Sequence, residues 1–420
     1  MLCITHTIVF FVCMISCNGV SYNDSSVSPF RQVIVLDNVI YIGAVGGIVA
    51  LHHENLSVIQ TKKIYSNNWL LLYDNNKDQV IQCNDNFTKT SWCRKLNSSL
   101  EIGDMVSSTM TVNITNLPSY TLVHVPQANV DVVIIAATSL QLLNDTYGIV
   151  SLNLETLRLF LPKQNQRGPM NIELGIGTNY DLVFKSTFRR SNYVYFFFQV
   201  WFKNGNFSTS KIGKLCNNNT NAKNRSSGFY HSYEDMTIKC ENFTHLQYQY
   251  FTEEFVLAVF SKDNSSAVCR FSWNSIETKF TESRKESLKC GQNTTNKDSY
   301  FIPKANLGNG KHENCFNKNG TCMKADKICD ELNGDFCNTE IHHTVIGETG
   351  IESKELVYVV DKVITALDLV RLNNNVILFV GTDNGEIATV CNYEYYIGML
   401  HFVYVLTHFN DLKIVFLRNK

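Results

Sequence analysis

The stretch that decides the fold is FVLAVFSKDNSSAVCRFSWNSIETKF, residues 255–280. Residues 255–260 are apolar throughout, which predicts a β-strand that is covered on both faces. Residues 261–266 are polar and predict a loop, and residues 267–271 predict the returning strand, followed by a further run over 272–277. Two short apolar runs around such a loop are typical of a β-hairpin, which an ordinary all-β protein would also contain.

Short strand pairs joined by turns recur along the chain. Residues 39–44 and 48–51 flank Gly46 and Gly47, which supply the positive φ angles that a two-residue hairpin turn needs. Residues 288–353 are polar and hold five cysteines, which predicts a loop excursion with a short helix near residues 325–332. Many short strands and few helices predict an all-β fold. A propeller of four-stranded sheets is one such fold, and it protects the edge strands of its sheets. Further strands are predicted over residues 30–35, 131–137, 147–154, 181–185, 193–202, 210–216, 355–360, 363–372, 376–380, 386–390, 402–407 and 412–417.

The N-terminal residues and the glycosylation sequons indicate secretion. Residues 1–20 contain an apolar core at 8–15 and small residues near 16–19, which is typical of a signal peptide; a buried strand or helix is the alternative. Thirteen Asn-x-Ser/Thr sequons suit a surface coated in glycan. The candidate N-glycosylation sites are Asn23, Asn55, Asn86, Asn97, Asn113, Asn144, Asn206, Asn218, Asn224, Asn242, Asn264, Asn293 and Asn319.

Cysteine usage agrees with an oxidising compartment. Of the fourteen cysteines, three lie in the expected signal peptide, and the remaining eleven should pair with one left over. Zinc binding is the alternative for the four cysteines at positions 315, 322, 329 and 337. Their spacing lacks the tight C-x2-C pairs of zinc modules, so we favour disulfides.

Composition and motifs exclude several classes of function. The net charge is −1 and no stripe of Lys or Arg is visible, so we expect neither a nucleic-acid partner nor an anionic membrane surface. No apolar run after the signal peptide reaches the roughly 18–20 residues that span a bilayer, so we expect no membrane insertion of this chain. Motifs for a serine nucleophile, a zinc protease and a phosphate loop are absent, so we expect no enzyme, no cofactor and no metal site. A propeller glycosidase is the alternative of another class, and it would show clustered carboxylates with raised pKa values at the central channel.

Several of the predicted strands resemble those of one extracellular family. The order of these motifs is more specific than any one of them. The resemblance is to the sema domains of semaphorins and plexins, and it implies a seven-bladed β-propeller over residues 28–417 with disulfide-stapled loop excursions. The motifs are YIGAV and GGIVAL at 41–51, YVYF at 193–196, SKIGKLC at 210–216, AVFSK at 258–262, ITALDLV at 364–370 and NVILFVGTDNGEIATV at 375–390.

The resemblance also implies disulfide pairings, which it carries over by matched flanking residues. It pairs Cys83 with Cys93, Cys216 with Cys337, and Cys240 with Cys269. In the polar excursion we expect Cys290 to pair with one of the next three cysteines, and we favour Cys329, which leaves Cys315 to pair with Cys322. Cys391 stays free. Each bridge should hold its Cα atoms roughly 4.4–6.8 Å apart. In this family the N-terminal segment pairs into the last blade, so residues 30–36 should lie beside the strands of residues 402–417.

Within the family the chain is more similar to plexins. SYE at 232–234, AVFSK at 258–262, GIVSLNLETL at 148–157 and DFC at 335–337 resemble plexin segments, and the cysteine-rich pattern of a semaphorin second blade is missing near 137–147. The similarity implies a plexin-like receptor ectodomain fragment that binds the sema domain of a semaphorin, with room for a co-receptor. A secreted semaphorin-like ligand that binds plexins is the alternative.

The resemblance weakens after Val390, and we expect the final blade to be incomplete or misjoined beyond that residue. Plexins continue into a cysteine-rich PSI module, immunoglobulin-like repeats, a transmembrane helix and a cytoplasmic GTPase-activating region, none of which this sequence contains. We expect the chain to enter the secretory pathway. It would lie on the extracellular side of the plasma membrane in a full-length receptor, or be secreted if it ends at Lys420.

Overall fold

The structure of the protein is a computed structural model, and the statements below concern the residues that it describes. These are residues 30–44, 46–53, 55–63, 67–74, 77–85, 91–97, 99–107, 110–111, 120–126, 131–142, 145–155, 157, 172–173, 180–202, 208–216, 234–289, 316–318, 321–323, 345–346, 350–372, 375–392, 401–407 and 411–417.

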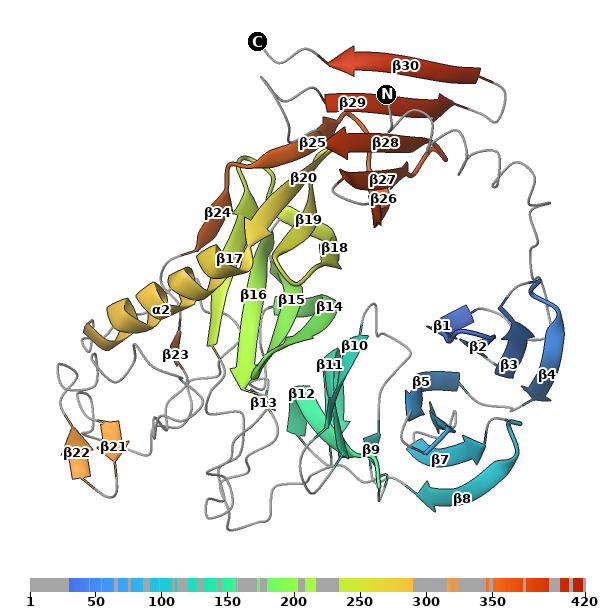
Figure 1. Ribbon diagram of the computed structural model, residues 1–420. Coiled ribbons are helices and arrows are strands. Elements are labelled where there is room, and N and C mark those ends of the chain that lie inside the picture. The colour runs from blue at the N-terminus through green and yellow to red at the C-terminus, as the bar shows by residue number, and fades with distance from the viewer. Residues whose placement is uncertain are drawn as a thin grey trace.

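The described strands form six sheets of four or more strands, which we number blades 1 to 6 in chain order, and one separate two-stranded ribbon. The blades follow one another around a ring, from the blue β1–β4 through the green sheets to the red β26–β30 (Figure 1). Strands of several neighbouring blades lie side by side, with β1 against β5, β10 against β14, and β18 against both β14 and β26. This radial repetition is the arrangement of a β-propeller.

Blades 1 to 3 lie within residues 30–173. Blade 1 contains β1 (Phe30–Val35), β2 (Val39–Ala44), β3 (Gly47–His52) and β4 (Val58–Lys63). Blade 2 contains β5 (Asn67–Asp74), β6 (Gln79–Asp85), β7 (Ser91–Asn97) and β8 (Ile102–Ser107). Blade 3 contains β9 (Met110–Thr111), β10 (Tyr120–Pro126), β11 (Asp131–Leu142), β12 (Asp145–Asn153) and β13 (Ile172–Glu173).

Blades 4 to 6 follow along the chain. Blade 4 contains β14 (Tyr180–Arg190), β15 (Tyr193–Phe202), β16 (Ser208–Cys216) and β17 (Glu234–Cys240), joined by β23 (Val345–Ile346) and β24 (Ile351–Ser353). Blade 5 contains β18 (His245–Phe251), β19 (Phe255–Lys262), β20 (Ser265–Ser272) and β25 (Leu356–Val360). Blade 6 contains β26 (Ile364–Leu372), β27 (Asn375–Thr382), β28 (Ile387–Asn392), β29 (His401–Thr407) and β30 (Asp411–Leu417). Helix α2 (Trp273–Lys289) and the ribbon of β21 (Phe316–Lys318) and β22 (Thr321–Met323) lie between β20 and β25.

The hairpin over residues 255–272 forms as predicted, and its first strand is covered on both faces. Phe255, Leu257 and Val259 of β19 belong to the apolar cluster shared with blade 6. The alternate residues Val256 and Phe260 belong to the cluster shared with blade 4. Burial of such side chains is worth about 25 cal/mol per Å² of apolar surface, so β19 is held from both sides by the dominant stabilising effect.

Two turns differ in detail from the sequence prediction. The loop expected over residues 261–266 is shorter, because β19 and β20 pair up to Lys262 and Ser265, and Asp263 takes a positive φ of 55° between them. In blade 1 the residue with positive φ is Gly46, whereas Gly47 already belongs to β3. Gly47 has another reason to be glycine, because an added Cβ would lie 2.4 Å from the carbonyl oxygen of Lys62.

The predicted closure of the ring by the N-terminal segment is wrong. Strand β1 pairs with β2 of its own blade, and no described strand of blade 6 pairs with it. The physical reason is local, since the amide of Leu36 donates to the carbonyl of Val39 at 2.9 Å and turns the chain into a tight hairpin. The final sheet, which we expected to lack strands after Val390, contains β29 and β30 in antiparallel register with β28.

Candidate functional site at the junction of blades 4 and 5

The connection between β20 and β25, residues 273–355, departs from the four-stranded pattern, and we call it the insert. It leaves blade 5 as α2 and returns along the outer edge of blade 4, where β23 and β24 pair with β17 in parallel. A Cβ atom on Gly350 would lie 3.0 Å from the Thr237 carbonyl oxygen, so glycine permits this close approach. Figure 1 shows α2 projecting outward from the ring beside these strands. The insert therefore fastens blade 5 to blade 4 at the place we call the junction.

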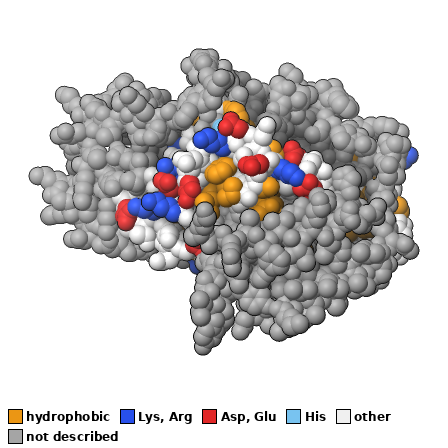
Figure 2. Space-filling view, turned by 90° about the horizontal axis from the view of Figure 1, so that it is seen from above, with side chains coloured by type: hydrophobic (Ala, Val, Ile, Leu, Met, Phe, Trp, Pro, Cys, Tyr) orange, Lys and Arg blue, Asp and Glu red, His pale blue; other side chains and the backbone are white. Residues whose placement is uncertain are grey.

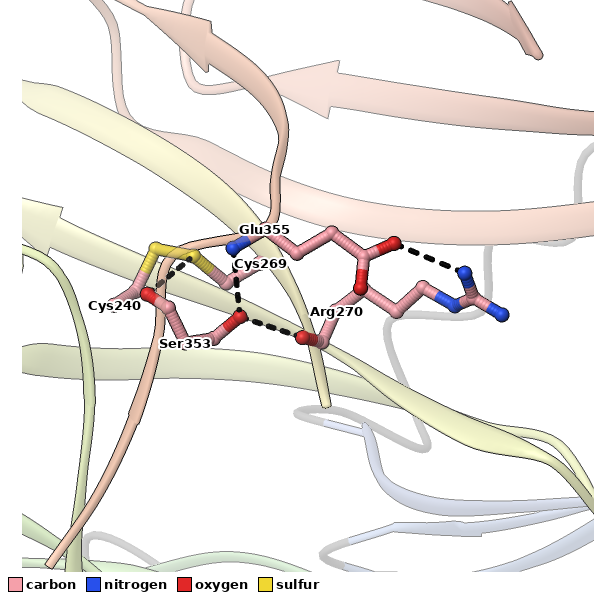
Figure 3. Close-up of a disulfide and its surroundings, with 5 residues drawn as sticks. All are labelled: Cys240, Cys269, Arg270, Ser353 and Glu355. Carbon is pink, nitrogen blue, oxygen red and sulfur yellow. Dashed lines mark hydrogen bonds and ion pairs between the residues drawn. A yellow bond between two sulfur atoms is a disulfide. The ribbon is translucent and has the colours of Figure 1, made fainter. Parts of the chain in front are cut away.

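A disulfide bridges the two blades where the insert ends. Cys240 closes β17 and Cys269 lies in β20, with their Cα atoms 5.8 Å apart and both side chains fully buried. The carbonyl oxygen of Ser353 lies 3.8 Å from the Cys269 sulfur (Figure 3). The same oxygen accepts a hydrogen bond from the Glu241 amide at 3.2 Å. Blade 4, blade 5 and the insert thus meet around one covalent bond.

Ser353 also binds the insert to blade 5. Its hydroxyl donates to the carbonyl oxygen of Arg270 at 2.6 Å and accepts from the Glu355 amide at 3.1 Å (Figure 3). The Arg270 guanidinium lies 2.9 Å from the Glu355 carboxylate. That ion pair is partly exposed and contributes at most about 1 kcal/mol, so the buried hydrogen bonds of Ser353 define the chain path.

The first residue of α2 is the apolar anchor of the junction. Trp273 is fully buried, and its ring stacks on that of Phe188 of β14 at a centroid distance of 5.6 Å. The ring centroid of Tyr195, on the neighbouring strand β15, lies 4.8 Å away. Its indole Nε1 donates to the carbonyl of Thr252 at 2.7 Å, so the polar edge of the ring is satisfied. The helix begins there because the Ser272 hydroxyl accepts from the Ser275 amide at 3.1 Å, which is an N-cap.

A buried charge network fixes the next turn of the helix. Glu277 of α2 accepts hydrogen bonds from the Tyr195 hydroxyl and from the ammonium group of Lys214. Lys214 is also 3.8 Å from Glu234 and lies 3.7 Å from the ring centroid of Tyr193, which favours a cation over its face. Burial, together with the neighbouring Glu277 carboxylate, raises the pKa of Tyr195 well above its usual range, so this residue stays a donor.

The buried carboxylates of β17 do not form a catalytic acid/base pair. Glu234 and Asp235 are adjacent on the strand, so their side chains point to opposite faces of the sheet. Each has its own cation, since Lys214 lies near Glu234 and Lys211 lies 2.6 Å from Asp235. On the outer edge of the same strand, the hydrogen bond from Lys239 lowers the pKa of Glu352.

The described residues show neither a cluster of metal ligands nor a membrane-spanning helix. Among the residues described, no group of three or more His, Cys, Asp or Glu side chains is placed to hold a metal ion. No helix in the described ranges combines the length and the apolar character needed to cross a membrane. Seen from above, the described surface mixes hydrophobic side chains with Lys, Arg, Asp and Glu, and no single sign of charge dominates it (Figure 2). Such a mixed face suits protein recognition better than binding to a polyanion.

The structure places five of the ten predicted disulfide cysteines in bridges. Cys83 pairs with Cys93 and Cys240 with Cys269, as the resemblance implies. Cys216 is disulfide-bonded, and its partner lies outside the described residues. The Cα distance of the first bridge is 4.0 Å, shorter than expected, because Cys83 and Cys93 face each other directly on neighbouring strands. Cys290, Cys315, Cys329 and Cys337 lie outside the described residues, as do the side chains of Cys322 and Cys391.

Four of the thirteen sequon asparagines are described, and all four are exposed. They are Asn55, Asn97, Asn242 and Asn264. The remaining predicted sites lie outside the described residues, as does the predicted signal peptide. These nine are Asn23, Asn86, Asn113, Asn144, Asn206, Asn218, Asn224, Asn293 and Asn319.

Sequence reasoning missed the helix and the buried lysines of the junction. The run expected over residues 272–277 is helical from Trp273 onward, and a signal for it was present. Trp273, Ile276 and Phe280 follow the three- and four-residue spacing of a buried helix face, and Ser272 is a preferred capping residue. The short helix expected near residues 325–332 lies outside the described residues.

Comparison with known proteins gives one family match. Residues 239–414 match the model of the family described as Sema domain, a stretch that begins at the end of β17 and includes the insert and both following blades. No curated protein sequence matches the chain.

Solved structures of plexins and semaphorins share the fold at low identity. The full extracellular region of Plexin A4, domains 1 to 8, is 17% identical with a TM-score of 0.68, and the match covers 94% of this chain and 51% of that chain. Drosophila Plexin A in complex with Semaphorin 1b is 14% identical with a TM-score of 0.58, covering 91% and 79%. Drosophila Semaphorin 1b, extracellular domains 1–2, is 15% identical with a TM-score of 0.56, covering 94% and 79%.

The chain therefore spans about half the length of the Plexin A4 chain that it matches. The matched solved structures are propellers of the seven-bladed sema type, and blades 1 to 6 are the sheets found in the residues described here. The buried disulfides indicate an extracellular protein, because such bonds persist in oxidising compartments. Residues 239–414 therefore match the Sema domain model, and the chain shares the fold of the sema domains of plexins and semaphorins.

Proposed function

We propose that the chain is the sema propeller of a plexin-like receptor and that it binds the sema domain of a semaphorin without enzymatic activity. The observation that carries the proposal is the Cys240–Cys269 bridge, which forms where the plexin-like flanking residues place it. The SYE segment at 232–234, which ends on the first residue of β17, and the AVFSK segment in β19 support the plexin side of the family. The solved complex of a Drosophila plexin with a semaphorin supplies a precedent for the kind of partner.

The geometry supports recognition through a rigid surface. The insert is bonded to blade 4 by strand pairing and to blade 5 by Ser353, so the junction is organised before any partner arrives. Preorganisation lowers the entropy cost of binding, which favours a specific contact of the usual 1,200–2,000 Å². We place the protein on the extracellular side of the plasma membrane as part of a longer receptor, with residues 1–20 as its signal peptide and residues 28–417 as its propeller.

The test is to secrete the glycosylated chain from cultured cells, immobilise it and pass dimeric semaphorin ectodomains over it. Saturable binding to at least one semaphorin, lost after thermal unfolding of the immobilised chain, is the expected result. Binding to plexin ectodomains alone would support the alternative of a semaphorin-like ligand. Binding to neither class would overturn the proposed partner and leave the fold assignment intact.

A further inference from the structure

Trp201 is a large aromatic side chain that the fold leaves exposed in a fixed orientation. It lies at the end of β15, and 42% of its surface is accessible to solvent. Its ring stacks on His245 of β18, with centroids 5.8 Å apart and planes inclined by 15°. Its Nε1 donates to Gln199 at 3.2 Å, and Gln199 is itself buried. The Trp201–His245 pair is therefore an oriented, partly exposed aromatic surface shared by blades 4 and 5.

A glycosylation sequon directly precedes this pair in the chain. Asn242, Phe243 and Thr244 form the sequon, and His245 follows. Three residues of chain span at most about 10 Å. One or two sugar rings attached to the side chain of Asn242 can therefore reach His245. Asn242 is exposed, and in the described part of the chain its side chain makes no hydrogen bond. Its amide nitrogen is therefore open for attachment.

The turn that carries Asn242 is held on both sides. The amide of Cys240 donates to the carbonyl of Phe243 at 3.1 Å, and the amide of Phe243 donates back to Cys240 at 2.8 Å. Cys240 is fixed by its disulfide, and after the turn the carbonyl of Thr244 accepts from the Ser210 hydroxyl at 2.5 Å. Since Ser210 belongs to β16 and lies opposite Gln199 of β15, the sequon and Trp201 sit on one rigid frame.

We propose that Asn242 carries an N-linked glycan whose first sugar rings pack on the Trp201–His245 pair. Attachment joins the Asn242 side-chain nitrogen to the anomeric carbon of an oligosaccharide, with loss of one amide proton and departure of the lipid diphosphate of the activated sugar donor. The apolar C–H face of a sugar ring then covers the indole, while its hydroxyl groups remain in water. We choose the glycan as the occupant because its covalent tether gives it a high effective concentration at the pair. A glycan bound there would exclude a protein from the same surface.

Other described sequons lack this arrangement. The side-chain amide of Asn97 donates to Glu101 at 3.1 Å, and the side-chain oxygen of Asn55 accepts from Ser57. Asn264 lies in the turn of the β19–β20 hairpin, and no ring stacking involves a residue of that turn in the described structure. Asn264 therefore serves as a matched control, exposed like Asn242 and remote in sequence from an oriented aromatic side chain.

The experiment compares the release of glycans from the native secreted chain by an endoglycosidase, followed by mass spectrometry of each glycopeptide. The Asn242 site should be occupied, and Trp201→Ala should speed release at Asn242 about fivefold, the ratio that corresponds to about 1 kcal/mol of stacking. Trp201→Phe should keep the protection, and release at Asn264 should not change. A second readout leaves Trp201 unchanged and removes the glycan. Asn242→Gln should increase quenching of Trp fluorescence by acrylamide, whereas Asn264→Gln should not.

Three results would overturn the proposal. One is an unoccupied Asn242 in the secreted chain. Another is equal release at Asn242 from the wild type and Trp201→Ala, together with unchanged quenching in Asn242→Gln. The third is a quenching increase in Asn206→Gln in place of Asn242→Gln, which would assign the Trp201–His245 pair to the glycan of the neighbouring predicted site.

Discussion

Of the two disulfides that the structure describes in full, one links strands within a single sheet and the other links two sheets. Cys83–Cys93 links neighbouring strands of blade 2, which already pair in register from Gln79 to Asp85. Cys240–Cys269 links β17 of blade 4 to β20 of blade 5, strands that belong to separate sheets. The first bond reinforces a contact that backbone hydrogen bonds already make, whereas the second joins two strands that do not pair with each other.

The energetics of the two regions follow from this difference. Closing a loop of 29 residues removes about 3.6 kcal/mol of chain entropy from the unfolded state at 25 °C, and closing one of 10 residues removes about 2.7 kcal/mol. The Cys240–Cys269 region adds a buried tryptophan, a buried charge network and the strand β24 to its disulfide. A propeller made of separate sheets thus places its strongest fastening where the chain leaves the regular blade pattern.

The strongest test of the junction is removal of its apolar anchor. Trp273→Ala should lower the free energy of unfolding by about 3–5 kcal/mol, because it leaves a large cavity among Phe188, Tyr195 and Phe251. The melting temperature of the secreted chain, measured by calorimetry or far-UV circular dichroism, reports this change. Trp273→Phe keeps most of the ring and loses the hydrogen bond to Thr252, so its melting temperature should lie between those of Trp273→Ala and the wild type. A wild-type melting temperature in Trp273→Ala would show that α2 does not hold the blades together.

The double variant Cys240→Ala/Cys269→Ala should rank next, with a loss of about 3.6 kcal/mol. Removing both cysteines avoids a free thiol, so the effect reports the bridge alone. Because Ser353 rests against the bridge, the insert should also open, and limited proteolysis should cut residues 273–355 faster than in the wild type. Unchanged cleavage in the insert, despite a lower melting temperature, would separate the bridge from the path of the insert.

The matched variant Cys83→Ala/Cys93→Ala should lose less, about 2.7 kcal/mol or below. The hydrogen bonds between β6 and β7 remain in this variant, and they hold the two positions opposite each other. Cleavage in the insert should stay at the wild-type rate, because blade 2 does not contact it among the packed elements described. A loss equal to that of the Cys240–Cys269 variant would contradict the contrast between the two regions.

The strands of the propeller could be predicted because their signal is local. Residues 194–200 of β15 and 255–261 of β19 are buried on both faces, which is why neither stretch alternates regularly with polar residues. Strand β24 could not be found this way, since it is three residues long and is defined by parallel pairing with β17, more than one hundred residues earlier. The N-terminal closure failed because it came from the family pattern and not from the residues, whose tight turn at 36–39 favours a local hairpin.

The charged residues of the candidate site could not be predicted at all. Lys211 and Lys214 flank Ile212 and Gly213 on a strand, and their type predicts solvent exposure, yet only 1% of the surface of each is exposed. Burial of a lysine is affordable only with a partner, and the partners Asp235 and Glu277 come from elements later in the chain. The sequence holds both halves of each pair, but their pairing depends on the assembled blades.

The smallest expected effect concerns an exposed ion pair on the outer edge of the junction. Lys239 of β17 and Glu352 of β24 lie 2.8 Å apart and are both partly exposed. The hydrogen bond from Lys239 lowers the pKa of Glu352 below its usual value, so folding favours the ionised carboxylate. The contribution of this pair to stability is therefore present above about pH 4.3 and is lost as the pH falls through the lowered pKa.

Lys239→Gln should lower the melting temperature slightly at pH 7, and the difference from the wild type should disappear as the pH is taken below 4. Lys279→Gln is the control, because it removes a pair of similar exposure within α2, where the two partners are three residues apart and hold no separate strands together. High salt should shrink both differences at pH 7, since exposed pairs are screened. A difference for Lys239→Gln that stays the same from pH 7 to pH 3.5 would mean that Lys239 acts by packing along β24 and not through the charge of Glu352.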